Sequence, residues 1–467
     1  MSFRWRGIIA FGIAAVLGFT ATRLPEGVAE VRTQRSALVA ADAVDPERIA
    51  TVVLERDGVR YRFEQRAGNW QQVEPIPHAI DGWSMRQLIG RVLKAESVRS
   101  VELPAEESAR GPLLAEAGLA PPAGSIELIE ESDGASPART VRIDLGRRSL
   151  AGRAYARLAT AGDRYEVIDA SLHEYALGRD PKEFRRRDIF IDLGEVDRLA
   201  FRSGSNEIVL VRDGRRYRLE APVRTRADRA QVEELVDALR RAKSGGFVSD
   251  RPVEPSVYGL DPAMATLEVD SAGTRRTLLI GDAVSIGAQD RFGILDGTST
   301  VVRLPAAVLA PMVPRVDRMI DAVATGVRAR DVASIEIAPS DAPSTVGASA
   351  WISLRRETDG WTAGVAESRE AEPRRGVVDA ERVEGLLKSL TEARASAVEL
   401  GELPSDALVA TVTLIGFAGE PLDTVRIARR ASDGRFLLEN GDRVLRVHGE
   451  IDLPLTALDL GFRASGG

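Results

Sequence analysis

Three segments of this chain, at residues 81–95, 228–242 and 379–393, align without gaps and repeat one amphipathic pattern. Each begins with an aspartate, which favours helix N-termini because its carboxylate accepts the free amide hydrogens of the first turn. Apolar residues follow four, seven, eight and eleven positions later: Met85, Leu88, Ile89 and Val92; Val232, Leu235, Val236 and Leu239; Val383, Leu386, Leu387 and Leu390. This spacing predicts three helices, each with one apolar face that another structure must cover.

Short β-rich runs flank each of the three segments, and they indicate what covers those faces. Three runs precede each helix and four follow it, and the pairs Asp57-Gly58 and Asp213-Gly214 separate neighbouring runs. Both residue types tolerate positive φ, so the pairs predict tight hairpin turns. The unit reads β-β-β-α-β-β-β-β, for which a largely antiparallel sheet with one helix on one face is the simplest way to bury a core. The expected fold class is α+β, in tandem modules that follow a single N-terminal transmembrane helix.

The repeat has the size of a domain. Its period of about 140–150 residues is long enough for each copy to bury its own core. The expected division is 1–46 for a cytoplasmic stub, membrane anchor and linker, then 47–192, 193–328 and 329–467 for three modules, the last one degenerate. Glycine-, serine- and proline-rich stretches at 104–124, 132–138, 339–348 and 464–467 are expected to be mobile.

The amino terminus has the pattern of a membrane-targeting segment. Arg4 and Arg6 precede an uncharged, mostly apolar run at residues 7–22. This order is typical of a secretory signal or a signal anchor. We expect a retained anchor in the cytoplasmic (inner) membrane, with the bulk of the chain extracytoplasmic. Cleavage after Ala29 is the alternative.

Composition excludes several classes of protein. With 44% apolar and 28% charged residues, the chain is typical of globular proteins. Its net charge is −7 with acids and bases interleaved, so no nucleic-acid partner is expected. The absence of cysteine removes disulfides, thiolate metal sites, iron–sulfur clusters and cysteine nucleophiles.

No constellation in the sequence predicts a catalytic, cofactor-binding or metal-binding residue. The three histidines, His78, His173 and His448, lack metal-ligand spacing, and no phosphate-binding loop, dinucleotide fingerprint or nucleophile elbow occurs. Adjacent acids are expected on solvated faces: Glu106-Glu107, Glu130-Glu131 and Glu233-Glu234. We therefore expect a protein that is not an enzyme and needs no cofactor.

Two peptides have both a functional and a structural interpretation. The first, Tyr258-Gly259-Leu260-Asp261-Pro262, could form a binding loop, but a turn is favoured because glycine supplies an unusual φ and proline stops a strand. The second, Arg185-Arg186-Arg187, could meet anionic lipid headgroups, but decoration of a hinge between modules is favoured.

The second module resembles the uncharacterised domain of unknown function 4340 family. The residues that carry the resemblance are Asp213-Gly214, Tyr217, Pro222, Ala227-Asp228, Phe247-Val248, the 258–262 peptide, Leu279-Ile280-Gly281 and Val316-Asp317-Arg318. The first module keeps part of this pattern, and the third keeps Trp361, Asp379 and the strands. The resemblance implies an envelope protein anchored by one N-terminal helix, in some cases beside gliding-motility-type ABC transporter components.

Together these features favour a non-catalytic, membrane-anchored envelope protein that serves as a scaffold or accessory component with protein partners. An extracytoplasmic protein that binds peptide or glycan through sheet edges or the Trp70 and Trp361 strands is the alternative. A hydrolase that uses carboxylates alone is the third hypothesis, and it requires a cleft that holds two of them.

Overall fold

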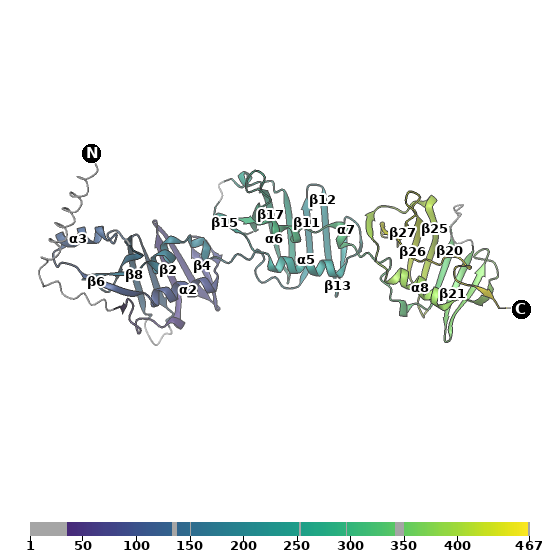
Figure 1. The fold of residues 1–467 in the computed structure, drawn as a ribbon, viewed down its shortest axis with the longest axis horizontal. Coiled ribbons are helices and arrows are strands. Elements are labelled where there is room, and N and C mark those ends of the chain that lie inside the picture. Colours follow the sequence, from purple (N-terminus) through teal and green to yellow (C-terminus); the bar gives the residue numbers. More distant parts are fainter. Residues whose placement is uncertain are drawn as a thin grey trace, which may run out of the picture. The chain divides into compact units, whose positions relative to one another are not determined.

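The computed structural model describes residues 35–132, 138–149, 151–251, 254–295, 297–340 and 350–465 of the 467-residue chain. The chain divides into two compact units, Met1–Arg186 and Arg187–Gly467. Within the described residues, strands form one antiparallel sheet in the first unit and two in the second (Figure 1). The expected α+β class and tandem arrangement are confirmed. The boundaries expected near residues 192 and 328 stay predictions.

The helices and strands fall into three groups, one for each sheet. The first unit contains β1 (Ser36–Ala37), β2 (Ile49–Arg56), β3 (Val59–Arg66), β4 (Asn69–Glu74), β5 (His78–Ala79), α2 (Gly82–Leu93), β6 (Glu96–Glu102), α3 (Glu107–Glu116), β7 (Gly124–Glu130), β8 (Thr140–Ser149), β9 (Arg153–Leu158), β10 (Arg164–Asp169) and α4 (Ala170–His173). The second sheet and its helices contain β11 (Val196–Ser203), β12 (Asn206–Asp213), β13 (Arg216–Ala221), β14 (Thr225–Arg226), α5 (Arg229–Arg241), β15 (Gly246–Ser249), β16 (Ala265–Ser271), β17 (Thr274–Ala283), β18 (Arg291–Leu295), β19 (Val301–Leu304), α6 (Ala306–Met312) and α7 (Val316–Met319). The third contains β20 (Ser334–Pro339), β21 (Trp351–Glu357), β22 (Gly360–Ala366), β23 (Arg374–Val377), α8 (Ala380–Thr391), β24 (Ala397–Leu400), β25 (Leu408–Ile415), β26 (Pro421–Arg429), β27 (Phe436–Glu439), β28 (Val444–His448) and β29 (Arg463–Ala464).

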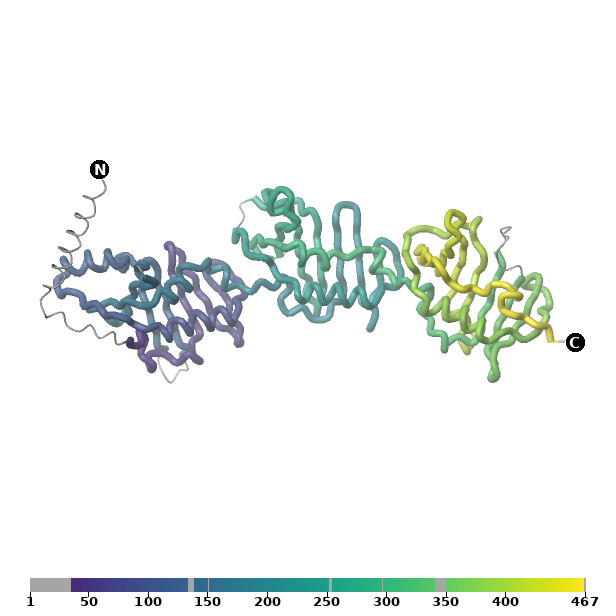
Figure 2. Tube along the Cα trace, in the orientation of Figure 1, coloured from purple at the N-terminus to yellow at the C-terminus, as the bar shows by residue number. Residues whose placement is uncertain are grey.

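All three sheets share one topology. The strand orders are β1-β6-β10-β9-β8-β7-β2-β3-β4-β5, β14-β13-β12-β11-β16-β17-β18-β19-β15 and β24-β28-β27-β26-β25-β20-β21-β22-β23-β29. Each helix leaves from one edge of its sheet, and the strand after it pairs at the other edge, so the helix must cross the sheet. The strands of each sheet come from one continuous part of the chain, as the colours of the tube in Figure 2 show.

The three predicted helices are confirmed, including their caps and buried faces. Asp81, Asp228 and Asp379 each accept an amide hydrogen of the first turn, from Ser84 at 2.9 Å, Gln231 at 3.1 Å and Glu381 at 3.0 Å. All twelve predicted apolar positions are buried. Because full burial of one such side chain is worth about 1.5–3 kcal/mol, four per helix are enough to fix which face meets the sheet.

The strand that follows each helix was missed from the sequence. β15 and β24 lie at an edge of their sheets, and β6 lies next to the short edge strand β1, so each module has one more main strand than expected. These strands lie near solvent and carry few buried residues, only one in β6 and none in the other two, so alternation of apolar residues is weak there.

Two local expectations were also wrong. The stretch 104–124, expected to be mobile, contains α3, which packs through Leu114 against Leu103 and Tyr165. The Asp213-Gly214 turn is shifted by one residue: Asp213 still pairs with Arg216, so Gly214 (φ 62°) opens the turn. The turn at Asp57-Gly58 forms as expected, with both residues at positive φ.

The N-terminal apolar run at 7–22 lies outside the described residues. Across the ranges that the structure does describe, no helix is both long enough and apolar enough to span a bilayer. The stretches 133–137 and 341–349 also lie outside the described residues. They contain most of the segments 132–138 and 339–348, which were expected to be mobile.

Candidate functional site at the junction of the second and third sheets

The histidines occupy three unrelated places. His78 Nδ1 lies 3.0 Å from the Ala79 carbonyl oxygen, whereas His173 and His448 each have one buried ring nitrogen without a hydrogen-bond partner in the described structure. Among the described residues, no group of three or more His, Asp or Glu side chains could hold a metal ion. The three histidines therefore share no candidate metal site within the described ranges.

The Tyr258–Pro262 peptide is a turn packed against β17. Gly259 has φ 64°, and a Cβ added there would lie 2.4 Å from the Asp282 carboxyl carbon. A Cβ on Gly281 would lie 2.1 Å from the Tyr258 carbonyl oxygen, and Leu260 is buried. The first module repeats this close approach: a Cβ on Gly146 would lie 2.3 Å from the Ala117 carbonyl oxygen. The glycines are needed for packing, which supports the turn interpretation.

The two tryptophans proposed as ligand contacts are buried. Trp70 belongs to the core of the first sheet. Trp361 belongs to the core of the third sheet, and its indole nitrogen donates to Glu384 of α8 at 2.9 Å. Neither ring forms the wall of an open groove, so the structure gives the peptide- or glycan-binding alternative no support at these positions.

The charged runs singled out in the sequence differ in their exposure to solvent. Arg185 is 1% exposed, and its Nε donates to Gln72 at 3.3 Å, so it cannot meet lipid headgroups. Glu130, expected on a solvated face, is buried and accepts from the Asp45 amide at 2.5 Å. This hydrogen bond and the neighbouring Arg139 lower the pKa of Glu130. Its partner Glu131 is exposed, as are the other two pairs.

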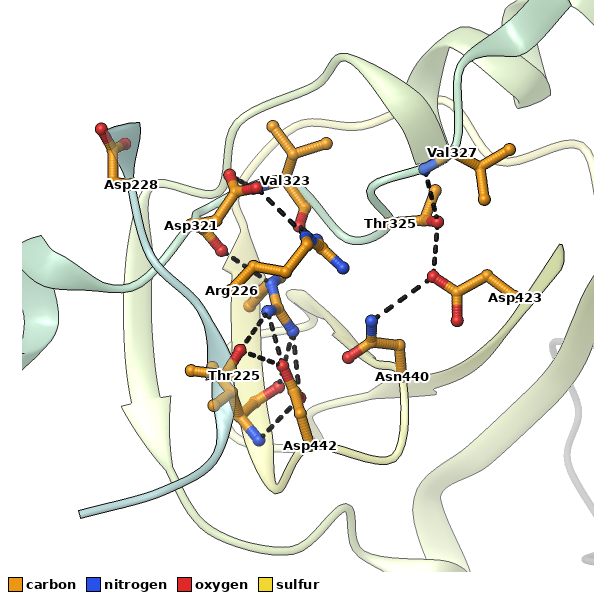
Figure 3. A network of polar contacts seen from close by, with 12 residues as sticks. Thr225, Arg226, Asp228, Asp321, Val323, Thr325, Val327, Asp423, Asn440 and Asp442 are labelled. Atoms are coloured by element: carbon orange, nitrogen blue, oxygen red, sulfur yellow. Dashed lines mark hydrogen bonds and ion pairs between the residues drawn. The ribbon is translucent and has the colours of Figure 1, made fainter. Parts of the chain in front are cut away.

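A polar network joins the second and third sheets within the second unit (Figure 3). Its members come from β14, the loop after α7, the turn before β28 and β28 itself. At its centre lies Arg446, which is fully buried. Two guanidinium nitrogens donate to the Asp442 carboxylate at 2.7 and 3.2 Å, and Nε donates to the Asp321 carbonyl oxygen at 3.0 Å.

The remaining donors of Arg446 are also used. They reach the Thr225 hydroxyl and the Val444 carbonyl oxygen, each at 3.3 Å. Thr225 in turn donates to Asp442 at 2.5 Å. All five guanidinium hydrogens thus have acceptors, which is the condition for burying a charge without a large penalty. Thr225 belongs to the second sheet, whereas Arg446 and Asp442 both belong to the third. The hydrogen bonds of Thr225 with this ion pair therefore tie the two sheets together.

Three further contacts extend this network along the junction. Arg226 donates to the Asp321 carboxylate at 3.3 Å and to the Val323 carbonyl oxygen at 2.7 Å. Thr325 donates to Asp423, on β26. In Figure 3 Asn440 lies between Arg226 and Asp442 on one side and Asp423 on the other.

The side-chain amide of Asn440 has two possible orientations. Its amide nitrogen lies 3.5 Å from the Asp423 carboxylate; with the amide turned, it donates to Asp442 and accepts from Arg226, both at 3.0 Å. The turned orientation satisfies both amide atoms, so it is the better match to the surrounding donors and acceptors.

Asp228 has a second role beyond the cap of α5. It is 4% exposed, and its other carboxylate oxygen accepts a hydrogen bond from Arg394, which follows α8 of the third sheet. This hydrogen bond raises the pKa of Arg394. A helix cap of the second sheet is therefore held by a guanidinium of the third.

A cavity of about 620 Å³ opens beside these residues. Its acidic walls include Asp228, Asp321 and Glu233, and each of these carboxylates is within ion-pair distance of an arginine, namely Arg394, Arg226 and Arg229. A carboxylate whose oxygens already accept from a guanidinium has fewer lone pairs left to hold a water molecule. The cavity does hold the pair of carboxylates that the hydrolase hypothesis requires, but Asp228, Asp321 and Glu233 are all engaged in ion pairs. Glu392 also lines the cavity.

His448, two residues after Arg446, is buried on β28. Burial, together with the nearby Arg446 charge, lowers the pKa of His448 from 6.5 to about 4. In the unfolded chain the imidazole of His448 binds a proton at about pH 6.5, but in the folded chain it does so only at about pH 4. Above pH 6.5 the imidazole is neutral in both states and does not lower the stability. Stability is then lost as the pH falls from about 6.5 towards 4.

We expect His448→Leu to remove that acid sensitivity. The wild-type free energy of unfolding should fall by about 2–3 kcal/mol more than that of the variant between pH 7 and 4.5. Urea unfolding at the two pH values measures the difference. Equal losses in both proteins would show that His448 is not responsible.

The junction was not predicted from the sequence. Its members are scattered from residue 225 to residue 446, and only Asp228 had been singled out, as a cap. One signal was present: Arg446 stands between Val444-Leu445 and Val447, and a charge inside an apolar strand run indicates a buried ion pair.

One family model matches part of the chain, and its description gives no function. Residues 217–410 match the family described as domain of unknown function (DUF4340), fewer than half of the residues of the chain. The match begins in β13 and ends in β25, so it crosses the junction. No curated protein matches this chain.

Among solved structures, one match is the DNA polymerase III subunit beta sliding clamp of Bartonella birtlesii. It is 9% identical with a TM-score of 0.11, over 87% of this chain and 94% of that chain. A TM-score this low supports no statement about fold or function. The resemblance seen in the sequence is confirmed by the family model over residues 217–410, which match the DUF4340 domain.

Proposed function

We propose that the chain is a non-catalytic envelope protein, held to the cytoplasmic membrane by its N-terminal segment, whose second and third modules serve as one rigid scaffold for protein partners. The basic start and the uncharged run at residues 7–22 support the attachment. The DUF4340 match itself gives no function. The accessory role beside a membrane transporter is what the resemblance to that family implies.

The junction between the second and third sheets is the observation that carries the scaffold. Val444 is part of the core of the second sheet, although it lies on β28 of the third, and the partly buried Val398 packs there too. With the buried Arg446–Asp442 pair, this shared core resists bending between the two sheets. A rigid pair of modules suits a protein that positions other proteins better than one that must close around a substrate.

Membrane attachment is tested with the full chain in its native host. After an alkaline carbonate wash it should stay with the membranes, and after mild detergent and cross-linking it should run well above its own 50.4 kDa, together with transporter subunits. Recovery as a free soluble monomer would refute the proposal.

A paired variant sharpens this test. Ile13→Lys with Val16→Lys places two charges in the apolar run, each costing about 2.5–3.5 kcal/mol at a bilayer centre, so the chain should be released. The control is Ile286→Lys with Phe417→Lys, because both side chains are largely exposed. The control should stay with the membranes.

A further inference from the structure

The first unit contains a basic groove at the outer face of α2. It has a volume of about 510 Å³, and five of the side chains that line it are cationic: Arg35, Arg86, Arg91, Lys94 and Arg153. Only two acids line it, Glu96 and Asp169, in a chain whose net charge is −7. The groove is thus an exception to the charge of the whole protein.

Most of this positive charge is not neutralised locally. Glu96 lies 3.6 Å from Arg35, and Asp169 lies 4.0 Å from Arg153, whereas the three cations of α2 and its C-cap form no ion pair in the described structure. The charge of Arg86 also acts on the nearby Asp81 carboxylate. Arg91 lies 4.8 Å from the Tyr175 ring centroid, and its Nε is buried without a hydrogen-bond acceptor there. Uncompensated cations around a hollow are suited to an anionic ligand.

An exposed tryptophan extends the same face. Trp83 is 58% exposed, a large value for this residue type. It lies three, seven and eleven positions before Arg86, Gly90 and Lys94, so all four project from one side of the helix. Tryptophan beside arginine and lysine is the combination found where proteins meet the headgroup layer of a membrane.

The equivalent helices of the other two modules lack this face. At the position of Arg86 they carry Glu233 and Glu384, and at that of Trp83 they carry Ala230 and Glu381. Acids and bases balance within α5 and within α8, whereas α2 contains two arginines and no acid. Since all three helices bury the same stripe, the fold does not require the charge of α2.

The groove lies close in sequence to the N-terminal apolar run, and this indicates which ligand it binds. Arg35 lines the groove. Only twelve residues separate Arg35 from the apolar run that ends at residue 22, a reach of at most about 40 Å. We propose that the Trp83–Lys94 face of α2 binds the phosphate groups of anionic phospholipids in the membrane surface. The choice of lipid over a soluble phosphate rests on the proposed membrane attachment.

Hydrogen exchange of the full chain in lipid nanodiscs tests this proposal. Amides of residues 82–94 should exchange roughly fivefold or more slowly in discs with phosphatidylglycerol than in neutral phosphatidylcholine discs, and high salt should abolish the difference. Arg86→Glu installs the residue of the sister helices and should weaken docking about thirtyfold, so the difference disappears. Trp83→Ala should reduce it.

The control is Arg241→Glu, because Arg241 is exposed and holds on α5 the position of Lys94 on α2. It changes the net charge by the same amount and should leave the lipid effect intact. Equal exchange in both kinds of disc overturns the proposal, as does equal slowing by inorganic phosphate in neutral discs, which would identify a soluble ligand.

Failure of the membrane attachment would be recognised separately. A chain that does not remain in either kind of disc contradicts the proposed function. Vesicles of phosphatidylglycerol added to that free chain then test α2 directly: slower exchange of residues 82–94 supports headgroup binding, and unchanged exchange refutes it.

Discussion

Arg446→Met is expected to lower the free energy of unfolding of the second unit by about 3–5 kcal/mol, because it leaves the Asp442 carboxylate, whose side chain is only 11% exposed, without its cation. The methionine fills much of the same volume, so the loss reports the charge and not a large cavity. Urea unfolding of the full chain, followed by circular dichroism, measures it.

Two variants bracket that result. Arg229 and Glu233 form an ion pair with the same four-residue spacing, but both side chains are more than half exposed, so Arg229→Met should cost less than about 0.5 kcal/mol. Adding Asp442→Leu to Arg446→Met removes the orphaned charge and should recover most of the stability. A cost below about 1 kcal/mol for Arg446→Met alone would show that the junction does not hold the sheets together.

Leu386→Ala is expected to cost about 2–5 kcal/mol, because this side chain of the repeated stripe is fully buried between α8 and its sheet. The same change at Leu88 and Leu235, the equivalent positions of the other helices, should cost a similar amount. Thermal and urea unfolding of the three variants provide the comparison.

The exposed Leu458, at 86%, is the matched control, and its replacement by alanine should change stability by no more than about 0.5 kcal/mol. If the three stripe variants behaved like Leu458→Ala, the helices would not be packed on their sheets. Unequal losses among the three would instead report how well each core closes around the cavity.

The three helices could be predicted because their information is local. A cap and four apolar positions lie within twelve residues of each other, and the same pattern occurs three times. The strands that follow the helices could not, because β15 and β24 have only four residues each and lie at sheet edges. Their place is set by the crossing of the helix, which is a property of the whole module.

The junction depends on contacts that no local pattern encodes. Thr225 and Arg446 are 221 residues apart. Thr225 alone is an ordinary polar residue in a strand, and the apolar run around Arg446 indicates that this arginine is buried but not which sheet it meets. Whether such a residue faces solvent or a neighbouring module depends on how two finished sheets meet. The basic face of α2 is an intermediate case: its residues are adjacent in sequence, but only comparison with the two sister helices distinguishes it.

Val444 contributes to the hydrophobic core of a sheet to which it does not belong. Copies that arose from one ancestral unit would at first have been interchangeable, each closing its own interior. Once a copy lends a side chain to its neighbour, deleting or reordering either one uncovers apolar surface in both. The last two modules should therefore behave as one unit, and deletion of either should destabilise the other.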